Sequence, residues 1–449
     1  MSFFLDYFKP APHIPPIKEP HEQNKQYYYW RIRILYTMFI GYGVYYFTRG
    51  TLAISMPQLK QMGYDEVYLG WLITFFQVSY GISKFVNGLI ADRANPRFFM
   101  ALGLVLSGLV SIAFGMTNSI ICFLFFWTLN GWFQGFGSAP CHRLLSHWYS
   151  PRERGRWWSV WNTSHNAGAA ILPLMGAYLL IEYGWQSVMI VPGVIAIFIG
   201  LFLVQHLRDT PQSLGLPPVE VFRNDHKESI PSSGVEKEFS YKEILWKHVL
   251  SNKWIWILSV SYFMVYVIRW TISHWAFYFL VESRGYAVWD AAKCIGWYEI
   301  GGFIGGIAAG WLSDISFKGN RTIVNLLFFS GLIPSLYAFS NLTATFPHPV
   351  LTQTLMGLIG FFIFGPQMLL AVHSVEITHK KASATAVGFL GIIAYLGSAI
   401  TGGPLGYLVQ HCGWQYVFVL LEVCACIGII STMSLFFMKK TRSFAISGS

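Results

Sequence analysis

Three basic residues lie inside long apolar stretches of the sequence. Arg49, Lys84 and Arg269 each interrupt a run long enough, at roughly twenty residues, to cross a bilayer. A charge at the bilayer centre costs at least about 2.5–3.5 kcal/mol, so such residues generally mark the path of a substrate or an ion. The one acid near their depth is Glu299. A single carboxylate cannot neutralise three cations, so the pattern predicts a site for an exchangeable anion.

The two arginines suit a phosphate group. A guanidinium donates two parallel hydrogen bonds to phosphate oxygens and stays charged at any relevant pH. Arg49 and Arg269 lie about fifteen residues into their spans, too deep to reach an interface easily. A purely structural pairing with carboxylates is the alternative, and the shortage of acids disfavours it. Lys84 lies nearer the end of its span, where a ligand role competes with snorkelling.

Polar and aromatic residues accompany these cations. His165 lies in a polar run at helical spacing, where a packing role and a ligand role have equal support. Glu299 is expected to balance one cation when the site is empty. Most aromatic residues of these spans must pack, but some are expected to contact the organic part of a substrate by stacking and hydroxyl bonds. The expected cavity residues are Tyr45, Tyr46, Tyr80, Trp161, Tyr266 and Tyr395.

The composition is that of an all-α polytopic membrane protein. Hydrophobic residues make up 54% of the 449 residues and charged residues only 12%, against about 25% charged in soluble proteins. Residues 1–33 are polar and contain no apolar segment typical of a secretory leader. The six cysteines are interpreted as reduced packing residues. No metal cluster, nucleotide loop or catalytic triad is evident, so neither an enzyme nor a bound cofactor is expected.

Twelve apolar stretches predict twelve transmembrane helices. They span residues 34–57, 67–91, 98–117, 119–142, 158–181, 186–205, 254–281, 290–312, 322–340, 348–374, 384–409 and 414–438. The predicted domains are an N-terminal six-helix half (1–205), a linker (206–250) and a C-terminal six-helix half (251–449). With a cytoplasmic N-terminus, cytoplasmic segments hold 25 of the 31 Lys and Arg residues and the outward loops 3. This bias predicts that both termini face the cytoplasm, and it explains the net charge of +10 without nucleic acid.

The two predicted halves repeat one another. Gly-x-x-x-Asp motifs at 88–92 and 310–314 are 222 residues apart, and Gly-Trp-Gln motifs at 184–186 and 413–415 are 229 apart. Arg49 and Arg269 are separated by 220 residues. Parallel six-helix repeats with a site between them at midplane describe the major facilitator architecture. The glycines are expected to let helices pack closely, and each aspartate to cap a helix or pair with a basic residue.

Several motifs along nearly the whole chain resemble the organophosphate:phosphate antiporter family. They include Phe-Lys-Pro-Ala-Pro-His at 8–13, Tyr-Tyr-Phe-Thr-Arg at 45–49, Trp-Asn-x-x-His-Asn at 161–166 and Arg-Asp-Thr-Pro-Gln at 208–212. The segments 46–49 and 361–369 look most like the hexose-phosphate branch. The resemblance implies exchange of a phosphate ester for inorganic phosphate by alternating access. It also implies that Arg49 and Arg269 hold the phosphate, with help from Lys84 and His165.

Two positions depart from the family pattern. The family usually carries Arg-Lys where this chain has Arg49-Gly50, and Asp-Trp where it has His274-Trp275. We hypothesise that Gly50 and His274 face each other across the cavity, where the family has an ion pair. His274 is also a candidate contact for the sugar.

The sequence thus predicts an inner-membrane antiporter of the bacterial type that exchanges glucose 6-phosphate, a hexose 6-phosphate, for inorganic phosphate. Two alternatives stay open. One is a transporter-like sensor of external glucose 6-phosphate, for which a partner kinase is expected. The other is a glycerol-3-phosphate:phosphate antiporter. The expected partners are these substrates and the lipid bilayer, and no nucleic acid is expected.

Overall fold

The computed structural model describes residues 8–91, 94–224, 246, 249–345, 348–378 and 383–436. Within these ranges the regular secondary structure is helical throughout. Contacts divide the chain into two compact units. Unit 1 comprises residues 1–52, 78–172 and 182–236, and unit 2 comprises residues 53–77, 173–181 and 237–449. The predicted division into two six-helix halves with a linker at 206–250 stays a prediction.

Three long helices contribute residues to both units. They are α2 (Pro20–Gln61), α3 (Glu66–Ala91) and α7 (Pro151–Tyr183). The other helices of unit 1 are α4 (Pro96–Gly115), α5 (Ile120–Gln134), α6 (Ser138–Trp148), α8 (Trp185–His206), η1 (Pro211–Leu214) and α9 (Val219–Phe222). Those of unit 2 are α11 (Lys253–Tyr278), η3 (Phe279–Ser283), α12 (Val288–Trp311), η4 (Leu312–Ser316), α13 (Arg321–Thr345), α14 (Pro349–Glu376), α15 (Ser383–Ile400), α16 (Gly403–Cys412) and α17 (Trp414–Ser434).

Each of the twelve predicted spans corresponds to one helix or to two consecutive helices. The fourth is α5 with α6, and the eleventh is α15 with α16. In the described part of the chain, nine spans are long and apolar enough to cross a membrane by length and composition. Three helices fall outside those nine, namely α2, α3 and α12, and they carry Arg49, Lys84 and Glu299.

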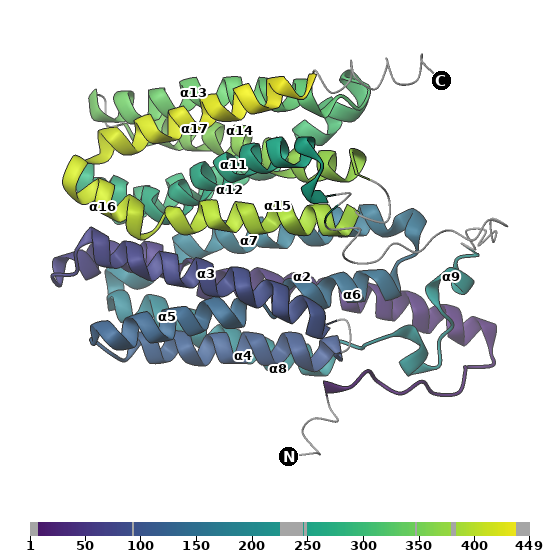
Figure 1. Ribbon diagram of the computed structural model, residues 1–449. Coiled ribbons are helices and arrows are strands. Elements are labelled where there is room, and N and C mark those ends of the chain that lie inside the picture. The colour runs from purple at the N-terminus through teal and green to yellow at the C-terminus, as the bar shows by residue number, and fades with distance from the viewer. Residues whose placement is uncertain are drawn as a thin grey trace, which may run out of the picture. The chain divides into compact units, whose positions relative to one another are not determined.

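Glycines bring helices into close contact inside each unit. In unit 1, α4 packs on both α5 and α8 (Figure 1). A Cβ atom at Gly108 of α4 would lie 2.5 Å from the carbonyl oxygen of Gly193 on α8, so neither position has room for a side chain. In unit 2, α12 packs along α14, and a Cβ at Gly302 would lie 2.6 Å from the Phe364 ring. The glycines of α12 thus let this helix pack closely on α14.

The two Gly-x-x-x-Asp motifs differ in what the structure shows. A Cβ at Gly88 would meet no atom of the described chain within 4 Å, so the close helix approach predicted at this glycine is wrong. Asp92 lies outside the described residues. In the second motif, Asp314 forms an ion pair with Arg321 at the start of α13, and Arg321 also pairs with Glu376 at 3.1 Å. The predicted pairing of this aspartate with a basic residue is confirmed.

The Gly-Trp motifs form matching turns in the two units. Gly184 between α7 and α8 has φ 80° and ψ 174°, and Gly413 between α16 and α17 has φ 87° and ψ 172°. Positive φ favours glycine because it has no Cβ atom. The following tryptophans serve as aromatic anchors: Trp185 packs 5.6 Å from Phe123, and Trp414 packs 4.9 Å from Phe279. The sequence repeat thus encodes one local structure twice.

The start of the predicted linker packs onto the N-terminal arm within unit 1. Asp209 accepts a hydrogen bond from the Ala11 amide at 2.9 Å and pairs with Arg143 at 3.1 Å. The amide of Ile14 donates to the Gln212 carbonyl at 3.1 Å. Residues 225–245, 247 and 248 lie outside the described chain.

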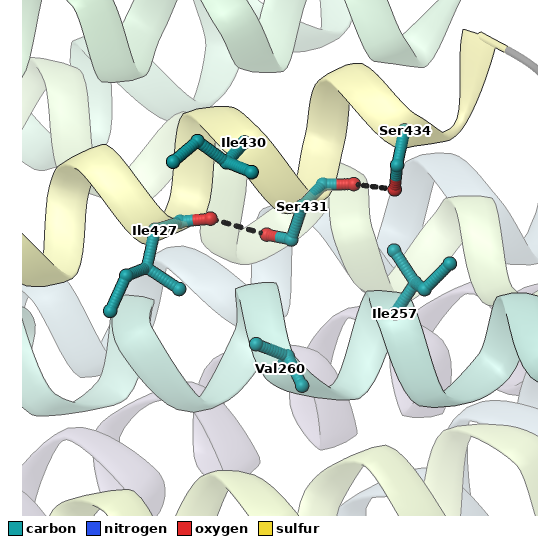
Figure 2. Close-up of a pocket in the computed structure, with 6 residues that line it drawn as sticks. All are labelled: Ile257, Val260, Ile427, Ile430, Ser431 and Ser434. Carbon is teal, nitrogen blue, oxygen red and sulfur yellow. Dashed lines mark hydrogen bonds between the residues drawn. The ribbon is translucent and has the colours of Figure 1, made fainter.

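An apolar pocket lies between α11 and α17 (Figure 2). Its volume is about 300 Å³, and it is lined by Ile257, Val260, Ile427, Ile430, Ser431 and Ser434. Both serine hydroxyls donate to carbonyls of their own helix, Ser431 to Ile427 and Ser434 to Ser431, each at 2.7 Å. A pocket of this lining offers nothing to hold a phosphate dianion. The charged constellations lie elsewhere.

Candidate functional site

The first constellation surrounds Arg49 in unit 1. Its side chain is buried, and its Cζ atom lies 4.1 Å from the centroid of the Tyr80 ring and 5.3 Å from that of Tyr46. The Tyr46 ring lies 5.5 Å from the imidazole of His165 on α7. Aromatic faces attract a cation through the ring quadrupole, and they do so without neutralising its charge. Four predicted site residues from α2, α3 and α7 are therefore neighbours.

A buried polar network fixes the helix turn that carries Arg49. Thr48 Oγ1 lies 2.9 Å from Ser107 Oγ, and Gln134 donates to both oxygens at 2.9 and 3.0 Å. Asn130 donates to the Thr48 carbonyl at 2.8 Å and accepts from Ser107 at 2.6 Å. Satisfied buried networks rigidify a core. This network ties α2 to α4 and α5, so it sets the depth and direction from which Arg49 projects.

Tyr45 and Trp161 occupy the core of unit 1. Tyr45 is 1% exposed, and its hydroxyl donates to the Met100 carbonyl at 2.7 Å. Trp161 is 2% exposed and packs 4.9 Å from Tyr42 and 5.3 Å from His142. These contacts are those of packing residues, and contact with the organic part of a substrate stays a prediction for both.

Lys84 is an exposed residue of α3. Its charge acts on His142, which stacks on Trp158 at 4.3 Å. His142 lies on α6, and the sequence reading overlooked it because it stands in a short polar run at the end of the fourth span. An imidazole that stacks on an indole face and feels the charge of a predicted site lysine belongs with the candidate residues.

The second constellation surrounds Arg269 in unit 2. The side chain is 5% exposed, and its Cζ atom lies 4.4 Å from the Phe364 ring centroid and 5.3 Å from that of Trp270. Tyr298 donates to the Arg269 carbonyl at 3.4 Å and packs 5.7 Å from Phe364. Arg269 is therefore held as Arg49 is, against aromatic rings in a buried setting. Phe364 and Trp270 are contacts that the cavity prediction did not include.

Two further candidates lie near Arg269 in sequence and packing. Tyr266, one turn before Arg269, lies 5.6 Å from Tyr395 of α15 in an edge-on arrangement, so these two predicted cavity residues are in contact. Glu299 of α12 is buried, at 5% exposure. The charges of Glu299 and Arg269 both act on Tyr298. This arrangement is compatible with the predicted balancing role of Glu299, which stays a prediction.

His274 links three elements of unit 2. Its Nε2 atom lies 3.1 Å from the Gln77 amide nitrogen, and its Nδ1 atom lies 3.4 Å from Thr401 Oγ1. Its ring stacks on Trp270 at 5.1 Å. In unit 1, a Cβ at Gly50 would lie 2.6 Å from Leu172, so glycine fits tight packing at that position. The hypothesis that Gly50 and His274 face each other, and the contact of His274 with a sugar, stay predictions.

All six cysteines are free, as the sequence suggests. Cys141, Cys294 and Cys424 are buried.

Comparisons with known proteins show which family this chain resembles. A family model described as Major Facilitator Superfamily matches residues 38–401. A probable hexose phosphate transport protein of Chlamydia pneumoniae is 45% identical over 441 residues, covering 96% of each chain. The membrane sensor protein UhpC of Escherichia coli is 40% identical over 427 residues, covering 95% of this chain and 97% of that protein. A glycerol-3-phosphate transporter of Bacillus subtilis is 37% identical over 437 residues, covering 96% and 97%.

A solved structure shows the same fold. It is a bacterial homologue of the human lysosomal transporter Spinster in an inward-facing, unoccupied conformation. The TM-score is 0.70 at 16% sequence identity, with 91% of this chain and 98% of that chain covered. The predicted all-α, twelve-helix major facilitator fold is confirmed. This multi-pass membrane protein belongs to the organophosphate:phosphate antiporter family of the major facilitator superfamily.

Proposed function

We propose that this protein is a secondary active antiporter that exchanges hexose 6-phosphate, with glucose 6-phosphate as the leading substrate, for inorganic phosphate. The observation that carries the proposal is the burial of Arg49 and Arg269 against aromatic rings within two membrane helices. Such cations are costly in a bilayer unless they serve an ion or a substrate. The hexose phosphate transport proteins among the relatives supply the substrate class.

The two arginines act as the phosphate ligands. Each guanidinium offers a planar set of donors that matches phosphate oxygens, and its charge does not depend on pH. The aromatic rings keep both side chains oriented and do not themselves carry a neutralising charge. A bound phosphate bridges Arg49 and Arg269, with Lys84 and His165 as additional ligands, and draws the two predicted halves together.

Exchange follows from electrostatic balance. With phosphate bound, the positive charges are neutralised and the halves can rock between outward-open and inward-open states. Without an anion, the cations repel one another across the closed state, so the empty carrier switches slowly. A ligand can shift such an equilibrium only through its different affinity for the two states. The carrier therefore alternates access when loaded, and exchange is favoured over net leak.

The charge distribution along the chain supports an orientation and a location. The excess of Lys and Arg in alternate loops favours cytoplasmic termini in a bacterial-type inner membrane. In that orientation the ends of α2 and α3 near Lys60 and Glu66 face outward.

One alternative is a sensor of external glucose 6-phosphate acting with a membrane kinase. It is favoured by the 40% identity to the membrane sensor protein UhpC of Escherichia coli. The other alternative is glycerol-3-phosphate exchange, which would keep the mechanism and change the organic part of the substrate.

A substrate panel separates these functions. The purified protein is reconstituted into phosphate-loaded proteoliposomes, and exchange of labelled phosphate is measured against external glucose 6-phosphate and glycerol 3-phosphate. Strong inhibition by glucose 6-phosphate and weak inhibition by glycerol 3-phosphate are expected. The reverse order would favour the glycerol-3-phosphate exchanger. Binding of glucose 6-phosphate without exchange would favour the sensor.

A further inference from the structure

Two arginines of unit 1 face one tryptophan of α2, and a third arginine, at the start of α4, binds the end of α8. Arg33 and Arg208 each place their Cζ atom 4.9 Å from the centroid of the Trp30 ring. Both guanidinium groups therefore lie close to the same indole ring, and so close to each other. Arg97 binds the Val204 carbonyl near the end of α8, four residues before Arg208. We name Trp30, Arg33, Arg97 and Arg208 the Trp30 cluster.

A helix-capping role accounts for only part of this cluster. Arg97 donates from Nε to Val204, and one nitrogen of Arg208 donates to the carbonyls of Gln205 and Leu207 at 3.0 and 2.7 Å. These bonds satisfy carbonyl groups at the C-terminal end of α8. Each guanidinium has five N–H donors, so both retain donors that the helix end does not use. Capping also leaves Arg33 on α2 unexplained.

Arg33 is oriented by aromatic rings. Its Cζ atom lies 5.5 Å from the Tyr29 ring, in addition to its contact with Trp30, and one of its nitrogens contacts the Tyr29 hydroxyl. Its Nε atom is buried and has no hydrogen-bond partner among the described residues. A buried N–H group that lacks a partner is costly and calls for an acceptor. The Trp30 cluster thus contains a buried N–H group that no described residue accepts from.

The charge of the cluster is not balanced by carboxylates of the described chain. Nearby basic residues are paired: Arg31 and Arg223 with Glu153, and Arg143 with Asp209. The ion pairs between described residues include none of the three cluster arginines. Burial, together with the charges of Arg97 and Arg33, lowers the pKa of Arg208. The three cations therefore repel one another, and an anion placed among them would relieve that repulsion.

Apolar stripes lead away from the cluster along its own helices. On α8, Phe198 and Leu201 are 67% and 54% exposed, and they lie ten and seven residues before Arg208. On α2, Tyr36 and Ile40 are exposed at three and seven residues after Arg33. On α2, these spacings place the stripe on the same helix face as Arg33. Arg208 follows the α8 stripe in the chain, two residues beyond the end of that helix. A cationic group at the end of an exposed apolar stripe, with a tryptophan beside it, is what a membrane interface requires.

We infer that the Trp30 cluster binds the phosphate of an anionic phospholipid headgroup, with the acyl chains lying along the exposed stripes of α2 and α8. The shared chemistry is a phosphate oxygen accepting from arginine, which a soluble phosphate ester also offers. The apolar stripes favour the lipid because only a lipid fills both parts of the surface. Basic pockets between helix ends bind anionic headgroups in this way. The site is separate from the Arg49 constellation, so the inference does not depend on the proposed transport.

The test measures lipid binding to the purified, delipidated protein by native mass spectrometry. Phosphatidylglycerol is titrated against the wild type and the triple variant Arg33→Gln, Arg97→Gln, Arg208→Gln. The expected result is at least about tenfold weaker binding by the triple variant, since each arginine near an anionic headgroup contributes on the order of 1 kcal/mol. A control variant removes three exposed positive charges elsewhere in unit 1 (Lys18→Gln, Lys25→Gln, Arg156→Gln) and should bind like the wild type.

A single variant and a displacement measurement provide two further tests of the lipid assignment. The single variant Arg33→Gln leaves the α8 capping bonds intact, so it should weaken phosphatidylglycerol binding even if the triple variant fails to fold. On the wild type, phosphatidylglycerol should not be displaced by inorganic phosphate or glucose 6-phosphate at millimolar concentration. Equal binding by wild type and Arg33→Gln, or displacement by either soluble anion, would overturn the lipid assignment.

Discussion

His274 accepts a hydrogen bond from Gln77, with 3.1 Å between the His274 Nε2 atom and the Gln77 amide nitrogen. Since an amide nitrogen only donates, this contact and the 3.4 Å approach of Nδ1 to Thr401 fit a neutral imidazole with its proton on Nδ1. The contact joins α3 to α11 within unit 2.

Replacing Gln77 should loosen this part of unit 2. The variant Gln77→Leu removes the donor to His274, and a loss of about 1 kcal/mol in the free energy of unfolding is expected. Hydrogen exchange should quicken in residues 66–77 and 399–406. The control Gln353→Leu, a partly buried position on α14, should leave exchange in those segments unchanged. Unaltered hydrogen exchange in Gln77→Leu would show that the contact between Gln77 and His274 does not stabilise this part of unit 2.

The ring of Tyr80 should matter for phosphate more than its hydroxyl does. Arg49 lies 4.1 Å from the ring centroid, and such a contact contributes about 0.5–2 kcal/mol. Tyr80→Phe keeps the ring and should exchange phosphate almost normally. Tyr80→Leu loses the ring and should raise the KM for phosphate by about two- to thirtyfold. Equal KM values for the two variants would exclude an orienting role for the ring.

Replacing Tyr45 distinguishes a packing role of its side chain from a contact with the substrate. Its hydroxyl donates to the Met100 carbonyl at 2.7 Å in the core of unit 1. Tyr45→Phe should lower the free energy of unfolding by about 0.5–1.5 kcal/mol and leave the KM for sugar phosphate unchanged. A raised KM for sugar phosphate with unchanged thermal stability would show instead that Tyr45 contacts the substrate.

The ion pair of Glu66 should make stability depend on pH. Burial raises the pKa of this carboxyl, but hydrogen bonds from Lys60 and Tyr278 outweigh burial and lower the pKa below its ordinary value of 4.5. Its contribution is therefore complete above the ordinary value and fades as the pH falls through the lowered pKa. Glu66→Gln should melt below the wild type at pH 7, and the difference should shrink under acid. A difference that is constant with pH would contradict this account.

The sequence predicted the elements better than the contacts. Hydropathy located the twelve spans because a membrane helix needs about twenty apolar residues. The repeated Gly-Trp motifs were recognised as a repeat, and the structure adds that each forms a turn with a positive φ at its glycine, Gly184 and Gly413. Helical periodicity does not specify which neighbour a side chain meets. For that reason the contact of Gln77 with His274 and the stacking of His142 on Trp158 were not foreseen.

Glycines show the same limit. A glycine in a span indicates close packing, and this holds at Gly302 and fails at Gly88. The two sites differ in what lies opposite, which is a property of another helix and cannot be read from the motif itself.

The most direct test of the central claim is labelled phosphate exchange in proteoliposomes by Arg49→Lys and Arg269→Lys. Lysine keeps the charge and loses the planar fork, so both variants should lose at least about tenfold in exchange rate. The matched control is Arg284→Lys. Arg284 follows η3 and donates to the Ser340 carbonyl, and this variant should exchange phosphate normally. If both site variants exchanged phosphate at the wild-type rate, these arginines would not be the phosphate ligands, and the proposed mechanism would be wrong.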